Sequence, residues 1–437
     1  MPRKLAASGL VLMLAVSGAA WAESSSPSQS PSSGEPPLTL AAARSLALAR
    51  NWELLAARAE LDLAAAQRIV AGALPNPQLS ATLTSSSSEN LAPGNGPSGS
   101  ANVSAIGLSE LVEIGKRGNR IHSSESARSA AQARFEFARA SLDAAVIKGY
   151  VAALAADAAA RINRASAASL ARAADIAAAR ESAGEISRVE RDQVAIAAGR
   201  FEADTKSAEA AALQARIALQ VLLGVADPDG RVALADDAEK LRPLGAALAA
   251  RALEPATTPA EPDARGDVRA AGHEAERTLA ELKLQKALRI PDPTLEVGWQ
   301  HDQTLPSPNS FGLGVSFTLP LLSWNKGGIR AAEVAHDSAL RSVEQTKARA
   351  RSEVAAARAA YAAAVARRSL VYDQLLPKAE SVQQTVAFAY EKGGASLLEL
   401  LEAERNANDL RLAALGTIAE SLSALADLAG ALGETLE

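Results

Sequence analysis

The stretch FGLGVSFTL, residues 311–319, decides the fold of this 437-residue chain. Every second residue is large and apolar, and the residues between them are glycine, serine or threonine. Because successive side chains of a strand point to opposite faces, this pattern predicts a strand with one apolar and one small, polar face. About nine to eleven tilted residues of this kind cross a bilayer, although an ordinary surface hairpin would show the same alternation.

Three further stretches alternate in the same way: 79–84, about 102–112, and 295–299. The first two are predicted to pair as one hairpin, and 295–299 is predicted to pair with 311–319 as a second hairpin. After the N-terminus we find no apolar run long enough for a spanning helix, so strands would have to enter the membrane. Four strands cannot close a barrel, and an open sheet edge cannot face lipid because its N–H and C=O groups would stay unpaired. The membrane interpretation therefore requires several copies of the chain.

The chain is predicted to be a tandem duplication. Pro-x-Pro-x-Leu occurs at 75–79 and 291–295, and turn segments at 115–118 and 181–184 match segments 210 residues later. Each half predicts a helix, a β-hairpin and a long helical hairpin. Repeat 1 covers 38–224, with its β-hairpin at about 78–112 and its helices over 116–223. Repeat 2 covers 267–433, with its β-hairpin at about 294–320 and its helices over 326–432. The proline-rich stretch 225–266 is predicted to be a linker, and Pro377 should kink its helix or end it locally.

The N-terminus has the pattern of an exported protein. Residues 1–22 are predicted to be a signal peptide, with basic Arg3 and Lys4, an apolar core and an Ala20-Trp21-Ala22 cleavage site. A membrane anchor, the alternative, would need about 18 apolar residues. Residues 23–37 form a Ser/Pro-rich leader. The chain has no cysteine, which excludes disulfides, cysteine-based metal sites and lipid attachment through an N-terminal cysteine.

Composition argues against an enzyme. Aromatic residues are only 3% of a chain rich in alanine, which suits long, closely packed helices. We find no G-x-S-x-G, P-loop or H-E-x-x-H motif, so no catalytic residues are expected. The four histidines show no helical pairing, so neither a metal site nor another cofactor is expected. Without the signal peptide the net charge is −7, from 43 basic and 50 acidic residues, which argues against nucleic-acid binding.

Four segments resemble the TolC-like outer-membrane efflux proteins, and the resemblance covers 38–433. They are LPNPQL at 74–79, VEIGKR at 112–117, LPLLSWNKGGI at 319–329 and AYEKGGASLLELLEA at 389–403. The first two look most like the heavy-metal branch of CzcC-like proteins. The resemblance implies an α+β membrane protein: a homotrimer whose twelve-stranded β-barrel in the outer membrane continues into a periplasmic α-helical barrel.

The resemblance also implies a function without catalysis. The chain would be the exit duct of a tripartite pump, with a periplasmic adaptor and an inner-membrane resistance-nodulation-division (RND) transporter as partners and heavy-metal cations as cargo. A multidrug or type I secretion duct of the same fold stays open. A soluble periplasmic coiled-coil structural or adaptor protein is a further alternative, but it would not need four alternating strands.

Candidate functional residues gather near the second helical turn. Glu399 and Glu402 are three residues apart on one helix face, and in a trimer they would form two carboxylate rings that favour cations. The resemblance places them at the family's gating aspartates. The alternative is a solvated acidic helix face that also includes Glu404. At the 210-residue shift, Asp192 matches Glu402, whereas Val189 stands opposite Glu399.

Two further features follow from the resemblance. Tyr390 matches a tyrosine that ties the closed gate through hydrogen bonds, and Ala395 replaces the family's latch arginine. The turns at Gly184, Gly393 and Gly394 would dock the adaptor, although their composition alone predicts only helix ends. Basic and aromatic residues after the strands suit the membrane–periplasm boundary or a plain helix start; they are Lys116, Arg117, Trp324 and Lys326.

Overall fold

The computed structural model describes residues 37–87, 100–236, 261–302, 307–319 and 323–435. The predicted signal peptide, the leader up to residue 36 and most of the predicted linker, 237–260, lie outside the described residues. Residues from Leu38 to Glu437 form one compact unit, which is described below.

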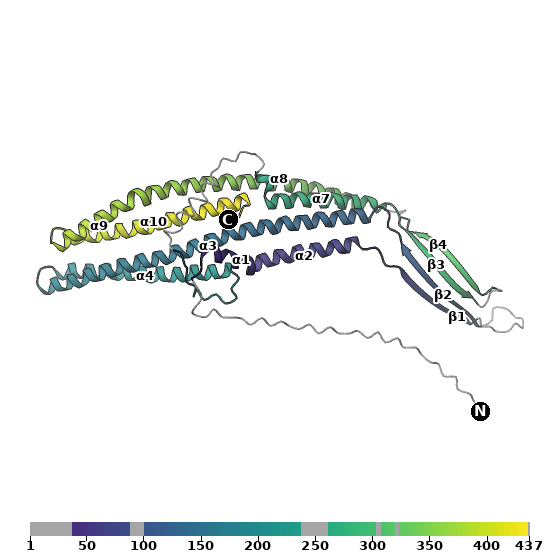
Figure 1. The fold of residues 1–437 in the computed structure, drawn as a ribbon, viewed down its shortest axis with the longest axis horizontal. Coiled ribbons are helices and arrows are strands. Elements are labelled where there is room, and N and C mark those ends of the chain that lie inside the picture. Colours follow the sequence, from purple (N-terminus) through teal and green to yellow (C-terminus); the bar gives the residue numbers. More distant parts are fainter. Residues whose placement is uncertain (1–36, 88–99, 237–260, 303–306, 320–322, 436–437) are drawn as a thin grey trace, which may run out of the picture. The chain divides into compact units, whose positions relative to one another are not determined.

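The element order repeats along this unit (Figure 1). The first half contains α1 (Leu40–Arg50), α2 (Trp52–Gly72), β1 (Gln78–Ser87), β2 (Ser100–Leu111), α3 (Arg117–Ser182) and α4 (Arg188–Leu222). The second half contains α6 (Glu261–Ala264), α7 (Gly266–Ala287), β3 (Pro293–Asp302), β4 (Asn309–Phe317), α8 (Lys326–Arg368), the π-helical segment η1 (Ser369–Leu375), α9 (Leu376–Glu391) and α10 (Leu397–Leu432).

The first predicted helix is broken at Asn51. Its side-chain oxygen accepts hydrogen bonds from the backbone N–H groups of Glu53 and Leu54, at 3.0 and 3.1 Å. Its side-chain amide donates to the carbonyl of Leu222 at 2.9 Å. An asparagine that satisfies the first free N–H groups of a helix is a favourable N-cap. The break therefore starts α2 anew and ties it to the end of α4.

The structure corrects the predicted alignment of the two halves by one position. Helix α3 corresponds end to end to the continuous stretch α8–η1–α9, so its first residue matches Lys326 and its last matches Glu391. The left-handed turn residues follow the same alignment, since Gly184 matches Gly393 and Gly224 matches Gly433. The error arose because Gly393 and Gly394 are adjacent. Only the positive φ angle of Gly393, 76°, identifies it as the turn residue. We call the alignment that pairs Gly184 with Gly393 the structural alignment.

Pro377 changes the helix type of the segment that precedes it. The helix that starts at Lys326 widens into the π-helical segment η1 before α9, which carries Pro377 in its first turn. A proline lacks the N–H group and its ring collides with the carbonyl of the preceding turn. A π-helical turn accommodates such a misfit while the helix continues. The predicted kink is therefore a change of helix type, which α3 lacks.

The core is built from alanines and a few large side chains where the helices cross. Tyr150 on α3 is fully buried, among Val146, Leu219 and Leu422. Helix α10 packs against α3, α8 and α9. An 18-residue window of α10 reaches a mean hydropathy of 1.4, so by length and composition it could span a membrane, contrary to the sequence expectation. More than half of that window, 56%, is buried inside the protein, which identifies α10 as a core helix.

The four described strands form one antiparallel sheet in the order β1-β2-β3-β4. Neighbouring strands therefore include β2 and β3, which belong to different halves of the chain. The sheet joins the helices through α2, α3, α7 and α8 (Figure 1). Strands β1 and β4 are its two edges, so each has one side without a described partner strand.

Candidate functional site

The sheet has one apolar face that is open to its surroundings. The strand register places Trp299 beside Phe311 and Val297 beside Leu313. The side chain of Leu313 is 90% exposed, and Phe311, Leu79 and Leu83 are almost as open. Individual exposed apolar residues are common, but a continuous apolar face marks a surface that contacts lipid or protein.

The opposite face of the sheet is small and polar. Gly107, Gly298 and Gly312 lie side by side across three strands. Glu296 is on this face and accepts a hydrogen bond from the Ser316 hydroxyl at 3.1 Å. An apolar face opposite a small, polar face is the division expected between the lipid side and the lumen side of a membrane barrel.

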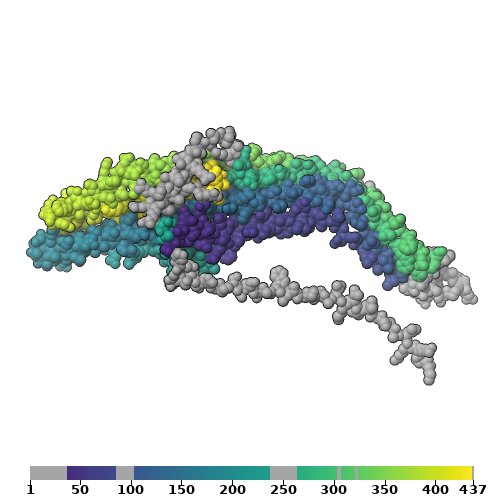
Figure 2. Space-filling model, viewed as in Figure 1, coloured from purple at the N-terminus to yellow at the C-terminus, as the bar shows by residue number. Residues whose placement is uncertain are grey.

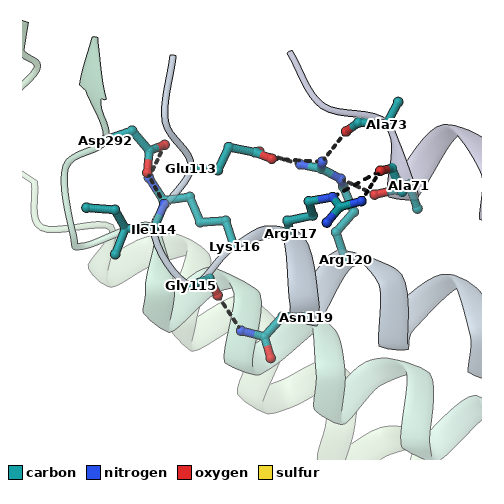
Figure 3. Close-up of polar contacts among 11 residues, drawn as sticks. Ala71, Ala73, Glu113, Ile114, Gly115, Lys116, Arg117, Asn119, Arg120 and Asp292 are labelled. Carbon is teal, nitrogen blue, oxygen red and sulfur yellow. Dashed lines mark hydrogen bonds and ion pairs between the residues drawn. The ribbon is translucent and has the colours of Figure 1, made fainter. Parts of the chain in front are cut away.

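A buried ion pair joins the two halves where strands meet helices (Figure 3). The Lys116 ammonium lies 2.5 Å from the Asp292 carboxylate, and Lys116 is almost fully buried. The other Asp292 oxygen accepts the backbone N–H of Ile114 at 2.9 Å. Asp292 therefore connects the end of the first hairpin to the start of the second.

Two arginines of α3 cap the C-terminal end of α2 (Figure 3). Arg117 donates two hydrogen bonds to the carbonyl of Gly72, at 3.0 and 2.7 Å. Arg120 donates to the carbonyls of Ala71 and Ala73, at 2.9 and 3.1 Å. A cation at the C-terminus of a helix satisfies free carbonyls and opposes the negative end of the helix dipole. Arg120 is held by the Glu113 carboxylate, which raises the arginine's pKa.

The basic and aromatic residues after the strands differ in their surroundings. Lys116 is buried in an ion pair, whereas Arg117 is exposed and caps α2. Arg117 and Lys326 are the first residues of α3 and α8, as the helix-start alternative predicts. Trp324 keeps an exposed side chain, with its carbonyl accepting a hydrogen bond from Arg289 at 3.3 Å. Trp324 and Lys326 both keep the exposure that side chains at a membrane interface require.

The two hairpin tips have the same turn geometry. Gly184 and Gly393 both have positive φ, and the residue after each donates its N–H back to a carbonyl one turn earlier. For the second tip this is Gly394 to Ala389, at 2.8 Å. The pattern is a Schellman helix end, which needs a glycine at the left-handed position only. Glu185 occupies the position of Gly394 at the first tip.

Both return helices begin with a capping box. The Ser396 backbone N–H donates to the Glu399 carboxylate at 2.7 Å, and the Glu399 N–H donates to the Ser396 hydroxyl at 3.3 Å. Ser187 and Glu190 make the same reciprocal pair at the start of α4. The counterpart of Glu399 is therefore Glu190, and the expectation of Val189 there is wrong. The serine hydrogen bonds lower the pKa of Glu399.

The remaining acidic candidates have different surroundings. Glu402 is exposed and, within the described part of the chain, its side chain forms no ion pair or hydrogen bond. Asp192 is paired with Arg191 at 2.6 Å and lies 4.0 Å from Arg188. In the structural alignment Asp192 matches Leu401, so it is not the counterpart of Glu402. Glu404 is buried, so it does not belong to a solvated face with the other two.

The ring of Tyr390, at the second hairpin tip, contacts an arginine of the first hairpin tip. The Arg180 guanidinium, at the end of α3, lies 5.2 Å from the centre of the Tyr390 ring. The tyrosine is 9% exposed, so the contact is largely shielded from water. A guanidinium over an aromatic face is a favourable cation–π pair. Arg180 is thus the partner that the structure gives to the Tyr390 ring, and the gate hydrogen bond of the Tyr390 hydroxyl stays a prediction.

Sequence reasoning missed Arg180 and Glu190. The S-x-x-E spacing at 187–190 and 396–399 is a recognised capping-box signal, and it would have revealed both the box and the correct alignment. Arg180 carries no local signal, because its partner lies in the other half of the chain.

An open, two-faced sheet carried on duplicated helical hairpins places this chain in the class of outer-membrane channels. The chain belongs to the outer membrane efflux protein family, whose sequence model matches residues 43–225 and 263–434. It is accordingly an outer-membrane protein that extends into the periplasm. Its relatives are efflux channels and not enzymes.

Individual relatives support the heavy-metal branch. The chain is 29% identical over 406 residues to the cobalt-zinc-cadmium resistance protein CzcC of Cupriavidus metallidurans, covering 91% of this chain and 90% of that protein. Among solved structures, the channel CusC aligns with a TM-score of 0.74 at 20% identity, covering 90% of this chain and 92% of that chain. A membrane protein from Pseudomonas aeruginosa aligns with a TM-score of 0.78 at 21% identity, with the same coverage. These structural alignments show a common TolC-like fold.

Proposed function

We propose that this protein is the outer-membrane exit duct of a tripartite efflux system and passively conducts heavy-metal cations. In this proposal an RND transporter in the inner membrane supplies the energy and a periplasmic adaptor connects it to the duct. The likeness to CzcC, whose name describes cobalt, zinc and cadmium resistance, supports this class of cargo.

The observation that carries the proposal is the sheet with an open apolar face and two open edges. Edge strands in lipid need partners because their backbone groups would otherwise lose their hydrogen bonds. Pairing β4 of one copy with β1 of the next satisfies them. Three copies then close a twelve-stranded barrel, with the glycine- and serine-rich face inward and the helices continuing as a tunnel in the periplasm.

The hairpin tips form the periplasmic mouth in this proposal. Glu402 contributes a ring of three exposed carboxylates, and Glu399 a second ring whose charge also caps α10. Such rings concentrate cations at a narrow entrance. Tyr390 holds the closed arrangement through Arg180, and Asp192 has a smaller part because Arg191 offsets its charge. The turns at Gly184, Gly393 and Gly394 present the tips to the adaptor.

The test combines a deletion strain with the purified protein. Loss of the gene should increase sensitivity to zinc, cobalt, cadmium or copper, while sensitivity to dyes stays unchanged. The purified protein should require detergent, have the mass of a trimer and form conducting pores in planar bilayers. A monomer that is stable without detergent would contradict the duct. Sensitivity to dyes alone would assign the same duct to drug efflux.

A further inference from the structure

One carboxylate lies among glycines and hydroxyl groups on the small, polar face of the sheet. In the strand register, Glu296 of β3 stands beside Ser109 of β2 and Gly314 of β4. Its side chain is exposed. The strands form one sheet that projects beyond the ends of the helices, as Figure 2 shows with β3 and β4 in green. We name the side of the sheet that carries Glu296 the polar face.

Contacts with β4 hold this carboxylate in one orientation. One Glu296 oxygen accepts the hydrogen bond from the Ser316 hydroxyl, and the other lies 3.4 Å from the place where a Cβ on Gly314 would be. The side chain therefore lies across the sheet toward β4, in space that the glycine leaves open. Within the described residues Glu296 forms no ion pair, so no neighbouring cation offsets its negative charge.

The polar face carries acidic side chains and no basic ones. Among the strand residues that the structure describes, the charged residues on this face are Glu296 and Asp302, and both belong to β3. The other positions are glycine, alanine, serine, threonine, glutamine, valine or leucine. Charges of one sign on the wall of a channel raise the local concentration of ions of the opposite sign. The charge of the polar face therefore favours cations.

The polar face lacks the side chains that hold transition metals tightly. The one histidine of the described strands, His301, is paired with Asn309 and lies on the apolar face. The chain has no cysteine, and its methionines, Met1 and Met13, both lie in the predicted signal peptide. Thiolates, thioethers and imidazoles suit zinc and copper, whereas carboxylate oxygens suit harder cations. Because conduction requires an ion to leave as well as to enter, a carboxylate without such neighbours attracts a metal ion and lets it pass.

We propose that Glu296 is a charge-selectivity residue inside the barrel, which favours cations over anions through its electric field and without coordinating them. This rests on the proposed function, because a lumen exists only when several sheets close a barrel. Each copy then contributes one Glu296 to the wall. The carboxylates of Glu399 and Glu402 lie at the helical tips, and Figure 1 shows the tips and the strands at opposite ends of the helices. The two groups of carboxylates therefore act on cations at different places along the duct.

The substitution Glu296→Gln tests the charge alone. Glutamine has nearly the size of glutamate, and its side-chain oxygen can still accept the hydrogen bond from Ser316. In planar bilayers under a salt gradient, the reversal potential gives the permeability ratio of potassium to chloride. We expect this ratio to fall roughly twofold at about 0.1 M salt and to change little at about 1 M, because the Debye length shrinks from about 10 Å to about 3 Å.

The matched control is Glu110→Gln. Glu110 of β2 is exposed and is paired with Leu295, the residue before Glu296, so it lies on the apolar face. The control removes the same charge from the same part of the sheet but outside the proposed lumen, so its permeability ratio should equal that of the wild type. A Glu402→Ala background separates the barrel from the tips. Because charges farther apart than a Debye length are screened, Glu296→Gln should cause the same fold change in that background.

A second variant, Gly312→Lys, adds a cation to the polar face and leaves Glu296 in place. A Cβ at this position would meet no atom within 4 Å, so β4 has room for a side chain there. The lysine should offset the carboxylate and shift the permeability ratio toward chloride, and this variant decides if Glu296→Gln does not assemble. An unchanged ratio in the conducting variant, or an equal fall with Glu110→Gln, would overturn the role of Glu296. A wild-type protein without any pore would overturn the duct itself.

Discussion

The Glu399 carboxylate accepts hydrogen bonds from both the backbone N–H and the hydroxyl of Ser396, at 2.7 and 2.9 Å. The same side chain is a candidate for the carboxylate ring at the mouth of the channel. Glu399 therefore has two roles, because its carboxylate caps α10 through Ser396 and also carries a negative charge that can attract cations. Glu402, one turn away, carries the charge but its side chain makes no such hydrogen bond.

Single substitutions should separate these two roles. Glu402→Ala should raise single-channel conductance or weaken blockade by multivalent cations, and leave the tip intact. Ser396→Ala should weaken the cap by about 1 kcal/mol and leave the charge in place. Current recordings with cobalt or zinc at the periplasmic side would measure the first effect, and thermal unfolding the second. Equal recordings for Glu402→Ala and the wild type would remove Glu402 from the mouth.

The start of α10 should loosen in acid. The pKa of Glu399 is lowered by its hydrogen bonds to Ser396, so its contribution to stability is present above the ordinary glutamate pKa. That contribution is lost as the pH falls through the lowered value. A nitroxide at Leu398→Cys should therefore become more mobile below about pH 4. Glu399→Gln, which can still cap, should show no such transition between pH 7 and pH 3.

The contact between Arg180 and Tyr390 should depend on the aromatic ring and not on the hydroxyl. Tyr390→Phe should behave like the wild type, whereas Tyr390→Leu and Arg180→Ala should each lose about 0.5 to 2 kcal/mol of stability at the tips. A double-mutant cycle on thermal unfolding measures the coupling between the two residues. A large loss of stability with Tyr390→Phe would show instead that a hydrogen bond of the hydroxyl stabilises the tips.

The ion pair between Lys116 and Asp292 should be essential for the junction of strands and helices. Asp292→Asn keeps an acceptor for the Ile114 N–H but leaves a buried ammonium without its counter-charge. We expect a loss of about 3 kcal/mol, measured by thermal unfolding in detergent. Lys116→Met with Asp292→Asn, which keeps that acceptor and removes the ammonium, should recover most of this loss. If the single and double variants were equally unstable, the charge would not be the cause.

The two faces of the sheet should tolerate arginine differently. Leu313→Arg places a charge in the middle of β4 on the apolar face and should cost about 2 to 4 kcal/mol if that face meets lipid. Ser310→Arg lies on the opposite face of the same strand and should assemble normally with altered ion selectivity. Heat stability of the assembled protein on gels compares the two. Equal tolerance would show that the apolar face does not contact lipid.

Local patterns reveal the elements of this protein. The alternation in 311–319 predicts a two-faced strand, and β4 exposes Phe311 and Leu313 on one face with Gly312 and Gly314 on the other. The turn glycines mark the ends of the long helices because only a residue without a side chain adopts their positive φ without strain. These features depend on a few neighbouring residues, so a single sequence contains them.

Relationships between distant residues were decided by the tertiary structure. Glu404 looks like one more acidic residue on a helix, and only the contact of α10 with α3 shows that it is buried. In the sequence, Asp292 has the pattern of a turn residue, and only the structure shows its ion pair with Lys116. Arg180 likewise lies in the first half of the chain, and only the packing of the two tips brings it to Tyr390. Periodicity along one chain determines which side of a helix is apolar, but the neighbour that covers that side depends on how separate helices pack.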